Sequence, residues 1–177
     1  DDIVYGTFSL DTLNGGGQGG DRERMRFFVD NNGDTNDANF GDGQLTMREA
    51  VQQSNDDDII HFGKLTAATP QVINVTNGVF AIDKSLTFRG IGAADRLTID
   101  GTGNGTRFMT ILTGVAVEIQ NLTIRNFNAA GGDGGGIFLD NGNLTMFNVI
   151  GRMNTAQNGG FLYMDGNDTT ATILNSQ

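Results

Sequence analysis

The sequence contains no cysteine and no tryptophan, and it has one proline and one histidine among 177 residues. Without cysteine there is no disulfide framework, thiol nucleophile, zinc–thiolate site or iron–sulfur cluster. A single proline excludes collagen and polyproline folds. No apolar run approaches the roughly 18 residues that a membrane-spanning helix needs, so we expect no membrane insertion.

Basic residues are also scarce. The chain has 11 Lys and Arg against 21 Asp and Glu, a net charge of −10. It offers no basic stripe for phosphates, so we expect no nucleic-acid partner. Hydrophobic residues make up 37% of the chain, which excludes a disordered acidic tail. What is abundant is glycine, with 27 residues.

The first 20 residues differ from the rest. A β-prone stretch is followed by a flexible glycine-rich tether at 14–20, so we predict that residues 1–20 form a strand on a tether and that residues 21–177 form one domain. The strand either folds back on its own domain or pairs with a neighbouring subunit. Its candidate self-association residues are Ile3, Val4, Tyr5, Phe8 and Leu10.

One helix is predicted near residues 46–54. Thr46 and Glu49 have the spacing of a capping box, in which each side chain accepts from the other's backbone N–H. Short strands are predicted on either side, within 25–29 and 59–62.

From about residue 70 the sequence repeats. The segment 122–127 resembles 144–149, 22 residues later, and 171–176 resembles it again after 27, while 135–139 resembles 159–163 after 24. Such periods predict a parallel β-solenoid whose coils stack about 4.8 Å apart. An antiparallel sandwich is the competing fold.

Alternation along these repeats predicts an inward and an outward face. We expect a core that contains Leu122, Ile124, Leu144, Met146 and Ile173. An asparagine follows each repeated strand, and stacked amides can hydrogen-bond one another. The predicted ladder consists of Asn126, Asn148 and Asn175.

The stretch 34–43 followed by Leu45-Thr46-Met47-Arg48-Glu49-Ala50 resembles the CSLREA segment of secreted bacterial β-helix proteins, although the two cysteines of that family are missing. The Gly-Gly repeats from residue 134 are similar to the coils of polymorphic outer-membrane proteins and autotransporter passengers. This resemblance implies a right-handed parallel β-helix with an N-terminal helical cap and an extracellular or cell-surface location. It implies no single activity.

A calcium site is one interpretation of the acidic loop. Asp30, Asn32, Asp34 and Asp37 place oxygen ligands at alternate positions, as at the start of an EF-hand loop. The glycine and glutamate that such a loop requires are absent, and Asx-turns in which the side chains bond their own backbone are the alternative.

We expect no catalytic site. The nearest approach to a charged cluster is Arg89, Asp95, Arg96 and Asp100, and solvated residues on a sheet face explain it more simply than the paired carboxylates of a glycosidase. His61 lies among Ile59, Ile60 and Phe62, where a structural role is expected.

The sequence therefore predicts a non-catalytic extracellular building block that associates with itself head-to-tail, by strand addition and end-to-end stacking. Outward residues such as Arg125, Phe147 and Tyr163 would supply contact chemistry. A monomeric adhesin that binds a surface glycan or host protein, and a polysaccharide lyase or hydrolase, remain alternatives.

Overall fold

The computed structural model describes residues 24–65 and 70–177. Up to residue 100 the elements are β1 (Arg26–Phe28), α1 (Met47–Gln53), β2 (Asp58–His61), β3 (Gln71–Asn74), β4 (Phe80–Ile82), β5 (Leu86–Arg89), a 3-10 turn η1 (Ala94–Arg96) and β6 (Leu97–Asp100). After residue 100 the elements are β7 (Met109–Ile111), β8 (Ala116–Arg125), β9 (Ile137–Asp140), β10 (Asn143–Arg152), β11 (Leu162–Asp165) and β12 (Thr170–Leu174).

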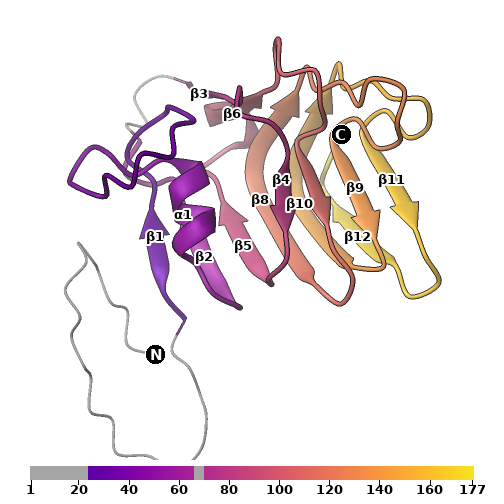
Figure 1. Ribbon diagram of the computed structural model, residues 1–177, viewed down its shortest axis with the longest axis horizontal. Helices are drawn as coiled ribbons and strands as arrows, with labels where there is room; N and C mark the ends of the chain where they lie inside the picture. Colours follow the sequence, from indigo (N-terminus) through magenta and orange to yellow (C-terminus); the bar gives the residue numbers. More distant parts are fainter. Residues whose placement is uncertain (1–23, 66–69) are drawn as a thin grey trace, which may run out of the picture.

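These strands form two sheets, and every paired strand is parallel to its neighbour. The first sheet has the order β1-β2-β5-β8-β10-β12, with β3 and β6 joined to it through β8. The second has the order β4-β7-β9-β11. The chain thus returns to the same two sheets in about four turns (Figure 1). The predicted β-solenoid is confirmed, and the parallel pairing excludes the sandwich.

Strands β8 and β10 are long because each turns a corner of the solenoid. The first half of β8 pairs with β5 and the second half with β6. Asn121 in β8 and Asn148 in β10 have φ values of 56° and 54° at this corner. Asparagine tolerates the left-handed conformation better than most residues, so the strand changes direction without a glycine.

The register corrects the predicted asparagine ladder. Asn148 lies opposite Asn121, 27 residues earlier, and opposite Asn175, the residue directly after β12. The counterpart of Asn126 is Met153, so the expected match of Asn126 with Asn148 is wrong. The motif Leu-Thr-x-x-Asn occurs once after the corner, at 122–126, and once before it, at 144–148. Segments of similar sequence therefore occupy different parts of the coil.

The glycine repeat is shifted by one residue. Ile137 pairs with Leu162, which makes Gly134 the counterpart of Gly159 and Gly135 the counterpart of Gly160. Gly134 and Gly159 have φ values of 64° and 58°, and a Cβ at either would lie within 2.4 Å of a backbone oxygen. Both positions therefore need glycine, for conformation and for space.

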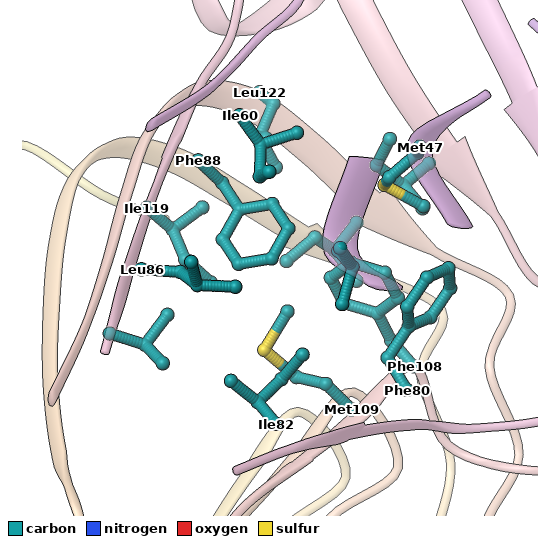
Figure 2. Close-up of a cluster of buried hydrophobic side chains, with 14 of the residues drawn as sticks. Met47, Ile60, Phe80, Ile82, Leu86, Phe88, Phe108, Met109, Ile119 and Leu122 are labelled. Carbon is teal, nitrogen blue, oxygen red and sulfur yellow. The ribbon is translucent and has the colours of Figure 1, made fainter. Parts of the chain in front are cut away.

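The core lies between the two sheets (Figure 2). Phe88 and Ile119 from the first sheet face Ile82 and Met109 from the second, and all four are at most 1% exposed. The predicted inward residues Leu122, Ile124, Leu144 and Met146 are likewise buried. Because each coil stacks on the next, one hydrophobic core runs along the solenoid.

Helix α1 confirms the helix prediction. Thr46 is the N-cap, and both bonds of the capping box with Glu49 are present. Met47, Ala50 and Val51 are buried in the same core as the strands, and α1 is drawn beside β1 and β2 in Figure 1. Within 24–65 and 70–177 no helix is long and apolar enough to span a membrane.

Candidate functional site

The acidic loop that follows β1 is held by its own backbone. The carboxylate of Asp30 accepts from the N–H groups of Gly43 and Leu45 at 2.9 and 2.8 Å. Asp37 accepts from the N–H of Asn39 at 2.9 Å, which is an Asx-turn bond. Asn32 is exposed.

The candidate calcium ligands are not brought together. Asp34 is turned into the protein, whereas Asp30 and Asp37 bond to the loop. Among the described residues no group of three or more His, Cys, Asp or Glu is placed to hold a metal ion. The loop geometry favours the Asx-turn alternative, and calcium binding stays a prediction.

Asp34 is a buried anchor. Its side chain is 2% exposed and pairs with the guanidinium of Arg48, with Nε–Oδ1 and Nη2–Oδ2 distances of 2.7 and 3.1 Å. Oδ2 also accepts from the N–H groups of Thr76 and Asn77, both at 2.8 Å. Arg48 lies 4.1 Å over the ring of Phe80. These contacts join the loop, α1 and the chain between β3 and β4.

The sequence indicated no partner for Asp34, because Thr76 and Asn77 are more than 40 residues away. Arg48 was visible in the helix segment, yet a surface arginine and a buried one look the same in a sequence. This site is electrostatic and structural, because the carboxylate is buried and is bonded to Arg48 and to two backbone N–H groups.

The charged cluster is divided between two parts of the first sheet. Asp100 in β6 accepts from Arg125 Nε at 2.8 Å and from the side chains of Thr102 and Asn126 at 2.6 and 3.1 Å. Burial by itself would raise the pKa of Asp100, but these hydrogen bonds and the Thr102 N–H outweigh it and lower the pKa to about 2. Asp100 is thus an ionised structural group, unsuited to donate a proton near neutral pH.

The other members of that cluster lie apart from Asp100. Arg89 in β5 donates to Gln120 at 3.1 Å, on the other side of the corner in β8. Asp95 and Arg96 both belong to η1, and Asp95 is exposed. The cluster therefore offers no pair of facing catalytic carboxylates.

His61 is part of an outward row of the first sheet. Its Nδ1 accepts from the N–H of Gly63 at 2.9 Å, and its ring centroid lies 5.1 Å from that of Phe28. Burial, together with the charges of Arg89 and Arg26, lowers the pKa of His61. These surroundings disfavour the charged imidazole, and the contacts with Phe28 and Gly63 give His61 a structural role.

The row that contains His61 continues across the sheet. Register places six outward residues in line along the solenoid: Phe28, His61, Arg89, Gln120, Phe147 and Leu174. Phe147 and Leu174 are 41% and 50% exposed. The predicted contact residue Phe147 therefore lies on an accessible face.

A shallow polar hollow of about 190 Å³ lies on the same sheet. Its lining includes Ala116, Thr87, Glu118 and Thr145, which belong to adjacent strands in register. Two carboxylates line it, Glu118 and Asp57, and Nη2 of Arg24 in the same lining lies 3.9 Å from Oδ1 of Asp57.

The edge strands β11 and β12 expose positions that are core positions elsewhere. Ile173 is 51% exposed, whereas its register partner Met146 and the next one, Ile119, are 1% and 0% exposed. Met164 is 42% exposed, whereas Leu139 and Ile111 are fully buried. The predicted self-association residues Ile3, Val4, Tyr5, Phe8 and Leu10 lie outside the described residues.

No family model matches this chain, and no curated protein or solved structure matches it. The function of the chain is therefore inferred from its fold and from the geometry described above.

Proposed function

We propose that the protein is a non-catalytic structural solenoid that associates with itself through the edge formed by β11 and β12. The observation that carries this proposal is the exposure of Ile173 and Met164, both at core positions. Among the described residues no further strand pairs with this edge, so its backbone N–H and C=O groups face outward and can accept another parallel strand. A strand added there would bury apolar side chains and complete a ladder at once.

Two sources of that strand belong to this chain. In end-to-end stacking, β12 pairs with β1 of the next copy, because β1 is the opposite edge of the same sheet. That arrangement continues the outward row by placing Leu174 beside Phe28. In strand donation, the β-prone residues 3–10 of the next copy occupy the edge, and the glycine-rich tether supplies the reach.

Head-to-tail contacts of either kind do not close on themselves and therefore produce a filament. The solenoid supplies the rigidity that such a filament needs, since its core is continuous from coil to coil. The resemblance to secreted β-helix proteins supports a right-handed winding, α1 as the N-terminal cap and an extracellular or cell-surface setting.

Light scattering and negative-stain microscopy of the full chain test the proposal. We expect particles larger than one chain, and Ile173→Asp should reduce them to monomers, because the charge would enter the new core. Thr172→Asp is the matched control, since Thr172 precedes Ile173 in β12, is exposed, and points to the opposite face of the sheet.

A full-length chain that stays monomeric at high concentration would contradict the proposal, as would assembly that survives Ile173→Asp unchanged. Deletion of residues 1–20 then separates the two sources of the strand. Loss of assembly on deletion supports strand donation, and retained assembly supports end-to-end stacking.

A further inference from the structure

Two neighbouring strands of the second sheet carry the same outward pair, an aromatic residue followed two positions later by aspartate. On β9 the pair is Phe138 and Asp140, and on β11 it is Tyr163 and Asp165. Register aligns Phe138 with Tyr163 and Asp140 with Asp165. We call these four residues the aromatic–aspartate face. Strands about 4.8 Å apart make it a short linear array along the solenoid.

The chain itself shows which group stacks on this face. The guanidinium of Arg107 lies 4.7 Å over the ring of Phe138, within the range of a cation–π contact. The rings of Phe138 and Tyr163 have centroids 5.7 Å apart and an interplanar angle of 19°. The array therefore begins with an arginine and continues as two nearly parallel rings.

Tyr163 has no such arginine within residues 24–65 and 70–177. Met109 pairs with Ile137, so the counterpart of Arg107 in the next coil is Gly135, which has no side chain. Among the described residues, no cation lies over the Tyr163 ring at a contact distance.

The carboxylates beside the rings retain acceptor capacity. Asp140 accepts from the Asn141 side chain at 3.3 Å through Oδ1, and Asp165 accepts from the N–H of Gly166 at 2.9 Å through Oδ1. Within the described residues the Oδ2 atom of each has no hydrogen-bond partner, and Asp165 is exposed. A carboxylate next to a ring suits a guanidinium, which donates in its plane and stacks through its face.

We propose that the aromatic–aspartate face binds an arginine-rich segment of a partner polypeptide, with one guanidinium stacked at Tyr163 and bonded to Asp165. The net charge of −10 attracts such a segment over a distance and speeds its association. This surface is the outward face of the second sheet, and its outer strand β11 is also part of the edge proposed for self-association.

A fluorescein-labelled oligoarginine peptide is the probe, and fluorescence anisotropy with the full chain measures its dissociation constant. We expect saturable binding that weakens as salt is raised. Tyr163→Leu and Asp165→Asn should each weaken binding about threefold or more, the effect of one lost cation–π or ion-pair contact at a partly exposed site.

Two matched variants serve as controls. Asp168→Asn removes the same charge from the neighbouring turn, and Phe147→Leu removes an exposed aromatic ring from the first sheet. Both should change the dissociation constant less than twofold. A circular dichroism melt of each variant establishes that the fold is retained, and Asp165→Asn keeps the test available if Tyr163→Leu is destabilised.

Three results would overturn the proposal. One is an equal loss of binding in Asp168→Asn and Asp165→Asn, which indicates attraction by net charge alone. Another is unchanged binding in both Tyr163→Leu and Asp165→Asn. The third is retention by a neutral oligosaccharide, lost in Tyr163→Leu, with no oligoarginine binding, which would make the face a glycan site.

Discussion

The side-chain amide of Asn148 donates a 2.8 Å hydrogen bond to the side-chain oxygen of Asn121, 27 residues earlier in the chain. Both residues have left-handed backbones and lie at the same corner of successive coils. The bond therefore ties corner to corner, where the strand pairing changes from one neighbour to another. Asn175, directly after β12, occupies the same position in the next coil and has a φ of 51°.

Substitution of Asn148 tests the two contributions of this corner separately. Asn148→Ala loses the side-chain hydrogen bond to Asn121 and places alanine, which tolerates the left-handed region less well than asparagine, at this corner. We therefore expect the free energy of unfolding to fall by about 2 kcal/mol. Asn148→Gly loses the bond alone, and about 1 kcal/mol is expected. Urea denaturation measures both, and equal losses would show that backbone strain is unimportant here.

The Asp34–Arg48 pair should dominate the stability of the segment before the solenoid repeats. Asp34→Asn leaves the Arg48 guanidinium without its carboxylate and weakens the bonds from Thr76 and Asn77. The expected loss is about 3 kcal/mol, as for other buried pairs with one partner removed. Asp42→Asn is the control, because the Asp42 side chain is 88% exposed. Thermal unfolding of the two variants side by side measures the difference, and similar midpoints would contradict the anchor role.

Asp100 should make stability depend on pH in the acid range. Its pKa is about 2 in the folded protein and ordinarily 3.8, so the unfolded chain takes up the proton first as pH falls. The stabilisation is present above pH 3.8 and disappears as pH falls toward 2. We expect Asp100→Asn to have a flatter stability profile over that interval, measured by urea titrations at several pH values. Parallel profiles would show that the hydrogen bonds to Asp100 do not favour its ionised form.

His61 predicts a second pH dependence, closer to neutrality. The pKa of His61 is lowered in the folded state from its ordinary value of 6.5. As pH falls below 6.5, His61 therefore binds a proton in the unfolded chain before it does so in the folded protein. Stability should be constant above that pH and decline as pH falls below it. His61→Gln should remove this decline, and NMR titration of the single imidazole provides the direct measurement. A folded-state pKa above 6.5 would reverse the sign and contradict the prediction.

Calcium gives a test of the acidic loop. Oδ1 and Oδ2 of Asp30 already accept from backbone N–H groups, and a bound ion would have to displace these bonds. We therefore expect the melting temperature after chelator treatment to be unchanged by added calcium. A rise in melting temperature that Asp30→Asn abolishes would establish the calcium site that the sequence suggested.

Several features were predictable because they depend on neighbours in the chain. The capping box of α1 depends on a spacing of three residues between Thr46 and Glu49, and the inward facing of Leu144 and Met146 depends on simple alternation. The solenoid followed from repeats at nearly constant spacing. In these cases the relevant interaction is local or is repeated many times.

The register and the charged contacts were decided by the tertiary structure. The similar segments 122–126 and 144–148 lie on opposite sides of the corner. Comparison of the sequences therefore matched Asn126 with Asn148, whereas the strand register places Asn121 opposite Asn148. Strand pairing is selected by burial along the whole coil, to which a single asparagine contributes little.

By itself, then, the sequence determined a winding β-chain with one capped helix and a largely apolar interior, since periodicity and capping are properties of short segments. Only the folded chain decided that Asp34 pairs with Arg48, that Asp100 pairs with Arg125 and that Arg107 stacks on Phe138. Asp100 and Arg125 are 25 residues apart and meet because successive coils stack, whereas Asp34 and Arg48 are 14 residues apart and meet because the acidic loop packs against α1. Electrostatic partners of this kind are set by proximity in the folded chain.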